Sequence, residues 1–220
     1  ENTIEHRFTE AESFRATDFR YAEEKREAEA LLERQFAAAR ASGSEVTVAV
    51  LRPAAVTGPR GRKRRSQIGL QAAMSGQLTG NTIHRIVSTL MSFVPVTQRW
   101  CWQFIHEDDI ADIVALAAFA TLRSNYDVLN VAPPGEIVRP RDVAQAFGRR
   151  LVRVHPQLVR LVFFLAWHGT RGRIPTPRGA WKPYCYPIVV DGSKLTTVYG
   201  YRYRMESIPA FTQNVGRFAS

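Results

Sequence analysis

The segment Tyr21-Ala-Glu-Glu-Lys25 opens a run that reaches Arg40 without a glycine or a proline. The run is rich in strong helix formers, and its apolar residues recur with a helical period, at Ala28, Leu31, Leu32, Phe36 and Ala39. This pattern predicts a helix over residues 21–40. Tyr21 and Lys25 are four residues apart, so they lie on one face of that helix, one turn from each other.

A phenol one turn from an ammonium group can take part in proton transfer. An unperturbed tyrosine titrates near pH 10, and a nearby cation favours the phenolate. Such a pair can exchange a proton with a hydroxyl or carbonyl oxygen near neutral pH. The same spacing is also found on many solvent-exposed helices, so the rest of the chain decides between the two interpretations.

The charge of the chain favours anionic partners. The 220 residues carry a formal net charge of +10, and the Arg-rich stretches lie at 60–65 and 139–178. A phosphate-bearing cofactor, a nucleotide-linked substrate, nucleic acid or a membrane surface would each suit this charge. Aromatic residues are not interleaved with the first stretch and no nucleic-acid motif is present, so we expect no nucleic-acid partner.

The cysteines and the apolar segments indicate a cytoplasmic protein. Cys101 and Cys185 are far apart and have no CxxC spacing, which favours two reduced thiols. The first twelve residues are polar and acidic, unlike a targeting signal. The longest apolar run, Leu158 to Trp167, contains Arg160 and is too short to span a bilayer. We expect a buried helix there, with a basic helix that touches a membrane as the alternative.

The order of the predicted elements indicates an α/β fold. After the first helix and a Gly43 turn, Val46 to Leu51 reads as a strand buried on both faces of a parallel sheet. The loop at residues 52–61 follows the carboxyl end of that strand, where ligands bind in such sheets. Its tip, Gly61 to Arg65, is either an anion site or a solvated charge run. Further strands are predicted at 100–105, 126–131 and 188–191, and further helices at 66–77, 107–123, 139–149, 156–168, 193–199 and 206–218.

Four stretches occur in a characteristic order: Tyr21-x-x-x-Lys25, Leu51-Arg-Pro-x-x-Val-x-Gly-Pro59, Phe104-Ile-His-x-Asp-Asp109 and Tyr126-Asp-Val-Leu-Asn-Val131. Together with the closing segment from Pro187 to Tyr203, they resemble the extended short-chain dehydrogenase/reductases, the NAD-dependent epimerase/dehydratase family. The resemblance implies a Rossmann-like, doubly wound and mostly parallel sheet with a smaller C-terminal substrate lobe. It also implies NAD or NADP as cofactor.

The resemblance assigns roles residue by residue. Tyr21 would be the catalytic acid/base, and Lys25 would bind the nicotinamide ribose and favour the phenolate. The remaining assignments are cofactor-binding residues at Pro53, Ala54, Ala55 and Val56, and substrate-binding residues at Arg60, Arg62 and His106. His106 has a packed position at a strand end as its alternative, and Asp108 and Asp109 are expected to cap the following helix.

The chain departs from the family pattern in its first part. The family's phosphate-binding glycine triplet does not occur, and the family's catalytic Ser or Thr would precede Glu1. The chain therefore resembles the C-terminal part of such an enzyme. Residues 1–60 would complete a Rossmann-like domain, and 61–220 would form a substrate lobe from which 100–131 returns to the sheet.

Several functional alternatives follow from these observations. The leading one is an NAD(P)-dependent oxidoreductase, epimerase or dehydratase acting at a hydroxyl or carbonyl carbon of a small molecule. A nucleotide sugar suits the basic loop, whereas a sterol-like substrate suits the apolar C-terminal stretches. The other is a non-catalytic binding or scaffold member of the same fold. In either case the resemblance suggests a homodimer formed through the helix at 21–40.

Overall fold

The computed structural model describes residues 2–12, 18–60, 93–146, 148, 150–169, 171, 179–213 and 215–219. The predicted helix at 66–77 and the basic loop tip at 61–65 lie outside these residues. The described helices are α1 (Arg20–Ala41), α5 (Glu107–Phe119), α6 (Pro140–Ala146), α7 (Pro156–Gly169), η1 (Lys182–Tyr184), α8 (Ser193–Thr197) and α9 (Ser207–Thr212). The described strands are β1 (Val48–Pro53), β2 (Ala55–Thr57), β3 (Phe93–Val96), β4 (Phe104–His106), β5 (Tyr126–Val131) and β6 (Arg150–Arg153).

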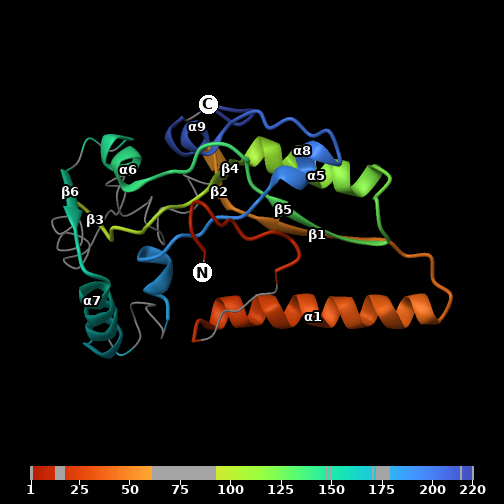
Figure 1. The fold of residues 1–220 in the computed structure, drawn as a ribbon, viewed down its shortest axis with the longest axis horizontal. Coiled ribbons are helices and arrows are strands. Elements are labelled where there is room, and N and C mark those ends of the chain that lie inside the picture. Colours follow the sequence, from red (N-terminus) through yellow and green to blue (C-terminus); the bar gives the residue numbers. More distant parts are fainter. Residues whose placement is uncertain are drawn as a thin grey trace.

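The centre of the fold is a parallel pair of strands between two layers of helices. β1 pairs with β5 over the whole length of both strands, from Val48 opposite Tyr126 to Pro53 opposite Val131. Helix α1 covers one face of this pair, and α5 and α8 cover the other (Figure 1). Helices on both faces of a parallel sheet define a doubly wound α/β arrangement. The predicted α/β fold is therefore confirmed.

The second sheet continues from the first. β2 begins two residues after β1 ends, and it pairs in parallel with β4. β4, α6, α9 and their connections contribute a cluster of buried apolar side chains. The cluster consists of Trp100, Phe104, Val138, Val143, Ala144, Ala210 and Phe211. The Thr57 hydroxyl donates to the Ala210 carbonyl at 2.7 Å, so it ties β2 to α9. A second cluster, Ile105, Ile113, Leu129, Val131 and Leu195, joins the two sheets to α5 and α8.

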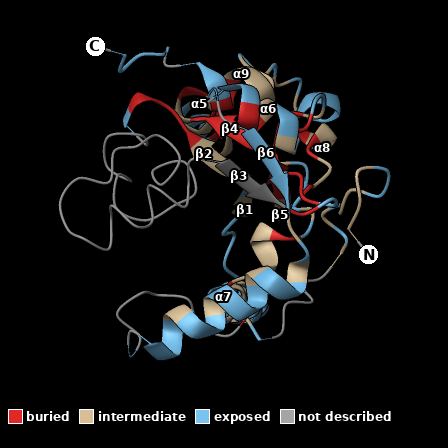
Figure 2. Ribbon diagram, turned by 90° about the vertical axis from the view of Figure 1, so that its left-hand side faces the viewer, coloured by how far each residue is buried: buried red, intermediate tan, exposed pale blue. Residues whose placement is uncertain are grey.

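A third part of the molecule lies beyond these sheets. β3 and β6 pair in parallel, and β6 leads into α7. In Figure 1, β6 and α7 stand at the end of the molecule opposite to the β1–α1 connection. Figure 2 shows that α7 is exposed along most of its length. The expectation of a buried helix at 156–168 is therefore wrong, because only one narrow side of this helix packs against other described residues.

Other differences concern the ends and surroundings of elements. The segment at 55–57, predicted as loop, forms β2 because β4 offers a parallel partner. The predicted strand at 188–191 makes only single bridges to described residues, from Val190 to Phe8 and from Ile188 to Trp102. The closing helix is α9 alone and ends at Thr212. β1 is half-buried and not buried on both faces, because α1 packs on it with polar side chains.

Both cysteines are buried free thiols, and burial raises the pKa of Cys185 to about 11.

Candidate functional site

Helix α1 runs antiparallel to the strands that it covers. Near the middle of α1, Glu29 accepts hydrogen bonds from the guanidinium of Arg52, which is one residue before the end of β1. Near the end of α1, the Phe36 ring lies 5.1 Å from the ring of Tyr126, the first residue of β5. At 1.5 Å per residue, Lys25 and Tyr21 lie about 6 Å and about 12 Å before Glu29 along the helix axis. Tyr21 therefore projects beyond the carboxyl end of β1, on the side where ligands of parallel sheets bind.

Tyr21 and Lys25 are close together and accessible. The Tyr21 side chain is 60% exposed, and its ring lies 5.9 Å from the Phe19 ring. The Lys25 Nζ lies 5.6 Å from the centroid of the Tyr21 ring, within the range of a cation–π contact. The ammonium group thus meets the face of the phenol ring, and the phenolic hydroxyl remains open to a reaction partner.

The expected cofactor-side segment forms part of the same carboxyl edge. The Ala54 N–H donates to the Val131 carbonyl at 3.0 Å, so it extends the pairing of β1 with β5 to its end. Ala54 and Val56 pack against the core formed by Ile105 and Leu129, whereas Pro53 is exposed. The segment is therefore held rigidly where the two sheets meet. Its predicted contact with a nicotinamide ring stays a prediction.

The N-terminal segment also lines this edge, which the sequence alone did not indicate. The Asn130 side chain is buried and donates to the carbonyls of Phe8 and Asp191, at 3.0 and 3.1 Å. The Asn130 N–H donates to the Glu10 carboxylate at 3.0 Å. Arg52 donates to the Glu10 carbonyl as well. Residues 2–12 are therefore fastened across the carboxyl ends of β1 and β5. The only sequence signal is the Asn130 amide near the end of the predicted strand.

Among the expected substrate residues, Arg60 and His106 occupy different surroundings, and Arg62 lies outside the described residues. His106 is fully buried. Its Nδ1 accepts from the Asp108 N–H at 3.2 Å, and its Nε2 lies 2.9 Å from the Val215 carbonyl, to which it donates in this tautomer. These contacts favour the packed strand-end interpretation. The exposed Arg60 stacks its guanidinium on the Phe218 ring at 3.5 Å.

Asp108 and Asp109 do not cap α5, contrary to the expectation. The capping acceptor is the His106 side chain, which precedes the helix. Asp109 Oδ1 accepts from the Tyr201 hydroxyl at 2.7 Å and from the Arg204 N–H at 2.9 Å. Asp108 Oδ2 accepts from the Arg217 N–H at 2.9 Å. Both carboxylates therefore hold the C-terminal segment instead of the helix start, because that segment passes directly over the first turn of α5.

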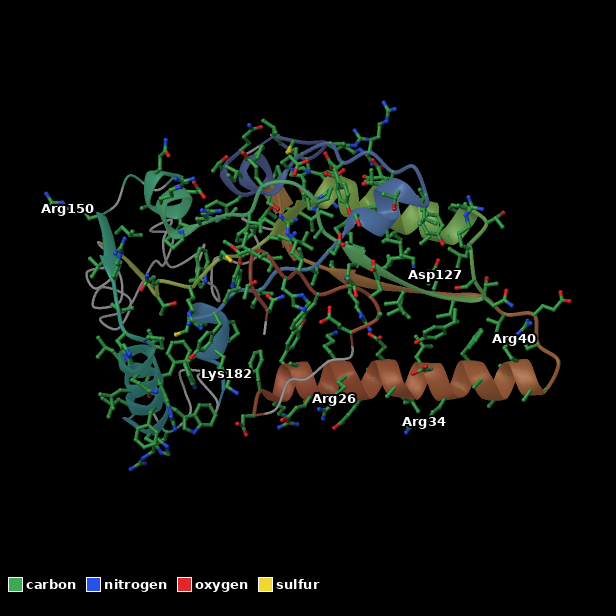
Figure 3. The ribbon with its side chains drawn as sticks, in the orientation of Figure 1. Arg26, Arg34, Arg40, Asp127, Arg150 and Lys182 are labelled. Atoms are coloured by element: carbon green, nitrogen blue, oxygen red, sulfur yellow. The ribbon has the colours of Figure 1, made fainter. Side chains whose placement is uncertain are left out.

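The turn at 179–182 contacts the segment just before α1. Gly179 has a φ of +81°, and a Cβ at this position would lie 2.1 Å from the Asp18 carbonyl oxygen. Only glycine permits this approach, three residues before Tyr21. The Lys182 ammonium lies 3.8 Å from the Asp18 carboxylate, and Figure 3 shows Lys182 beside the beginning of α1. Tyr21 therefore lies three residues from a close contact with the turn at 179–182.

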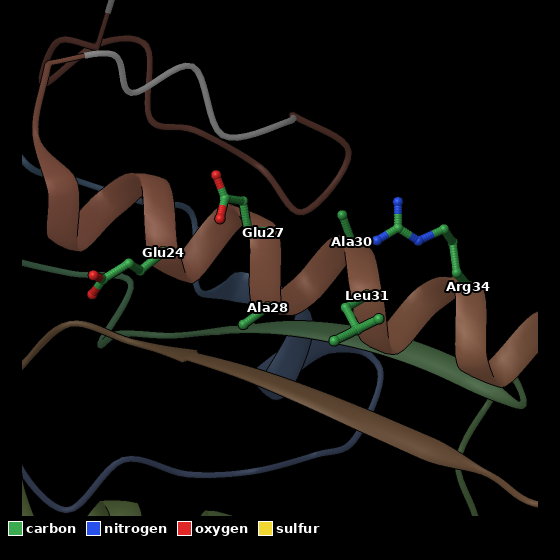
Figure 4. A pocket seen from close by; sticks show the side chains of 6 residues that line it. All are labelled: Glu24, Glu27, Ala28, Ala30, Leu31 and Arg34. Carbon is green, nitrogen blue, oxygen red and sulfur yellow. The ribbon is translucent and has the colours of Figure 1, made fainter.

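A separate hollow of about 540 Å³ lies on the surface of α1. It is lined by Glu24, Glu27, Ala28, Ala30, Leu31 and Arg34. Figure 4 shows Glu27, Ala30 and Arg34 along one side of the helix and Glu24, Ala28 and Leu31 along the other. The hollow includes neither Tyr21 nor Lys25, so it is distinct from the candidate site. No group of His, Cys, Asp or Glu suited to a metal ion occurs among the described residues.

Comparisons with known proteins support the fold. Neither a protein-family model nor a curated protein sequence matches the chain. Solved structures do match. The dTDP-glucose 4,6-dehydratase DesIV of Streptomyces venezuelae, crystallised with NAD and TYD, has a TM-score of 0.54 at 15% identity, covering 94% of this chain and 54% of its own. The UDP-glucose 4-epimerase of Stenotrophomonas maltophila, with bound NAD and formylated UDP-arabinopyranose, has a TM-score of 0.51 at 17% identity, covering 92% and 55%.

A third match is the UDP-glucose 4-epimerase of Thermus thermophilus in complex with NAD, with a TM-score of 0.50 at 16% identity, covering 97% of this chain and 62% of its own. At these identities the likeness shows a shared fold, namely the Rossmann-like α/β fold of epimerases and dehydratases. The chain spans little more than half the length of these three structures.

Proposed function

We propose that the chain carries the catalytic Tyr–Lys pair and the substrate lobe of an NAD(P)-dependent epimerase, dehydratase or dehydrogenase. The observation that carries the proposal is the orientation of α1, whose first two turns, with Tyr21 and Lys25, extend beyond the carboxyl end of the parallel strands. The motifs of the sequence and the kind of enzyme found among the structural matches support it.

The described residues fit one end of a nicotinamide dinucleotide. In this proposal the accessible Tyr21 provides a hydroxyl and Lys25 an ammonium group, and the backbone at 53–56 provides an apolar edge. Lys25 would donate to ribose hydroxyls, and residues 53–56 would lie against the nicotinamide. The glycine triplet that would hold the pyrophosphate is absent from the sequence, so the adenosine end has no counterpart in this chain.

The chemistry divides between cofactor and protein. The bound cofactor supplies the acceptor or donor of a hydride. Tyr21 takes the proton from the substrate hydroxyl, or returns it to a carbonyl oxygen, at its exposed phenolic oxygen. The positive charge of Lys25 one turn away stabilises the negative charge that forms on that oxygen. Residues 2–12 and the Gly179–Lys182 turn hold the surroundings of the pair in place.

A nucleotide sugar is the substrate class that we favour. Its diphosphate suits the basic character of the chain and the exposed Arg60, which precedes Arg62 by two residues in the sequence. His106 is less suitable as a ligand because both of its ring nitrogens are engaged. We place the reaction in the cytoplasm, where nucleotide-linked substrates and two reduced thiols are compatible. None of the described helices is long and apolar enough to span a bilayer.

Nicotinamide binding tests the proposal directly. NADH and NADPH fluorescence would be titrated with the chain and with Lys25→Ala and Tyr21→Phe. Losing a charge-assisted hydrogen bond should weaken binding by Lys25→Ala about tenfold or more. Tyr21→Phe should bind nearly as well as the parent chain but should not transfer a proton. The matched control is Arg34→Ala on the same helix, which should bind normally.

Two outcomes would contradict the proposal. Equal binding by Lys25→Ala and the parent chain would remove Lys25 from the site. A folded chain that binds neither nucleotide would favour the second candidate function, a non-catalytic binding or scaffold role. The specific observation behind that candidate is the absent glycine triplet.

We also propose a homodimer through α1. The hollow on this helix is lined by the apolar Ala28 and Leu31 and by side chains of both signs, Glu27 and Arg34 among them. In a two-fold interface the same helix meets its copy antiparallel, so the carboxylates of one can face the arginines of the other. Leu31→Glu should shift the sedimentation coefficient to that of a monomer, whereas Val114→Glu on α5 should not. Unchanged sedimentation of Leu31→Glu would reject this interface.

A further inference from the structure

Helix α7 exposes an unusually large apolar surface. Six large apolar side chains of this short helix are 37–58% exposed, namely Leu158, Leu161, Val162, Phe164, Leu165 and Trp167. On the adjoining strand β6, Leu151 and Val152 are each 39% exposed. So many exposed large apolar side chains on one helix are rare on a protein surface unless a partner covers them. Figure 2 shows α7 standing apart from the buried part of the molecule.

The helix is anchored to the protein through one narrow side. Val159, Phe163 and Ala166 are half-buried and lie three to four residues apart, on one side of α7. The Phe163 ring lies 5.3 Å from the ring of Tyr184 in η1. This stripe holds the helix in place, so the exposed side chains form a fixed, preorganised face that points away from the described core.

The same region carries positive charge alone. Between Asp142 and Asp191 the sequence has eight Lys and Arg residues and no Asp or Glu. Arg150 and Arg153 of β6, Arg160 of α7 and Arg171 beyond it are all exposed. Figure 3 shows Arg150 projecting from the far end of β6, away from the rest of the molecule. In the part of the chain that the structure describes, four exposed arginines therefore accompany the apolar face.

This combination restricts the identity of the partner. A second copy bound through the same face would bring arginines against arginines, which a two-fold interface disfavours. The phosphates of a nucleic acid would pair with the arginines, but the exposed apolar side chains would stay in contact with water or phosphate. An anionic lipid bilayer satisfies both, because apolar side chains enter the acyl boundary while arginines extend to the phosphates.

We propose that α7, together with β6, lies flat on an anionic phospholipid membrane. The 14 residues of α7 measure about 21 Å, so the helix cannot cross a hydrocarbon layer of about 30 Å. Leu161, Phe164, Leu165 and their neighbours insert among the lipid chains. Arg153 and Arg160 contact the lipid phosphates.

Vesicle flotation tests this proposal and excludes aggregation, because aggregates sink whereas vesicle-bound protein rises. The full chain would be mixed with vesicles of phosphatidylcholine and phosphatidylglycerol, or of phosphatidylcholine alone. We expect flotation with the anionic vesicles, reduced by added salt, and much weaker flotation with the neutral ones. Leu161→Gln/Leu165→Gln should lower the partition coefficient about tenfold or more, because half-exposed leucines drive insertion.

Two further variants separate charge from apolar contact. Arg153→Gln/Arg160→Gln should lose about fivefold per arginine on anionic vesicles and little on neutral ones. The matched control is Val114→Gln/Phe119→Gln, which removes exposed apolar side chains from α5 and should float like the parent chain. All these side chains are exposed, so the variants should retain the circular dichroism spectrum of the parent.

Three results would overturn the proposal. One is the absence of flotation with anionic vesicles. Another is equal flotation of the parent and Leu161→Gln/Leu165→Gln. The third is a fall in self-association, measured by light scattering, in the leucine variant without any vesicle binding, which would assign the face to a second copy.

Discussion

Asp109 is the residue on which the C-terminal segment depends most. Its side chain is fully buried in the first turn of α5, and one of its oxygens accepts from both the Tyr201 hydroxyl and the Arg204 N–H. Burial is the largest cause that raises the pKa of the Tyr201 phenol, and the Asp109 carboxylate raises it further. The hydroxyl therefore stays protonated and donates. A single carboxylate thereby fixes a segment that lies 92 residues further along the chain.

Asp109→Ala should therefore be strongly destabilising. The change leaves the Tyr201 hydroxyl and the Arg204 N–H without their acceptor, which should cost about 2–4 kcal/mol of unfolding free energy. Urea denaturation followed by circular dichroism measures it. The control is Asp112→Ala, one turn along the same helix, which is more exposed and should cost no more than about 1 kcal/mol. Equal losses in the two variants would contradict the role given to Asp109.

The contribution of Asp112 should depend on pH. The hydrogen bond from Arg217, with a further one from Arg204, keeps the pKa of Asp112 below its ordinary value of 3.8. A carboxylate with a lowered pKa in the folded state stabilises the fold above its unfolded pKa, and this stabilisation disappears as the pH falls through the folded value. The stability difference between the parent chain and Asp112→Ala should be constant above about pH 5 and shrink below about pH 4.

That difference is small because Asp112 is partly exposed, so it should also decrease with added salt. Urea titrations of both proteins across the acid range would measure it. A difference that grows as the pH falls would show that the arginines do not act on Asp112.

At the scale of the elements, α8 depends on a close approach of two backbones. Gly192 precedes α8, and a Cβ at this position would lie 1.9 Å from the Ala132 carbonyl oxygen, just beyond the end of β5. The carboxylate of Asp191, the residue before Gly192, accepts a hydrogen bond from the Ser193 N–H at 2.9 Å. The short helix is thereby pressed against the carboxyl end of the central strand, close to Asn130 and the N-terminal segment.

Gly192→Ala should displace α8 and destabilise the fold by several kcal/mol, on the order of 3. The matched control is Gly169→Ala at the end of α7, where an added Cβ meets no described neighbour and the backbone angle is ordinary. That control should be neutral or slightly stabilising. Thermal unfolding of both variants measures the effect. A Gly192→Ala variant as stable as Gly169→Ala would mean that the two backbones do not approach this closely.

At the scale of the whole molecule, exposed apolar surface limits solubility. α1 exposes Leu31 and Leu32, α7 exposes six large apolar residues, and in the described part of the chain β1 has β5 as its only strand partner. Unpaired strand edges and exposed apolar helices both favour association. The chain should therefore be marginally stable or prone to aggregation when it is isolated.

We expect a broad thermal transition accompanied by light scattering that increases with protein concentration. Leu161→Gln/Leu165→Gln should delay the scattering with little change in the unfolding midpoint, because both side chains are exposed in the folded state. Circular dichroism and static light scattering at several concentrations would be recorded together. A sharp, reversible and concentration-independent two-state transition would contradict the prediction.

Local sequence determined the elements that need only local information. α1 extends one residue beyond the predicted helix at each end, and β5 matches its prediction fully, because helix formers and strand-favouring residues such as Tyr and Val act within a few positions. The placement of Tyr21 and Lys25 on one helical face followed from their spacing. The α/β class followed from the alternation of helices and strands.

Only the tertiary structure decided which groups meet. It engaged both ring nitrogens of His106, with Asp108 and Val215. It paired Asp109 with Tyr201 and brought Glu10 to Asn130 near the carboxyl end of β5. It also left α7 exposed, although its composition is that of a buried helix. The physical reason is that hydropathy states how much apolar surface a segment carries, whereas burial depends on which distant segments pack against it. Those partners are selected by the arrangement of the whole chain.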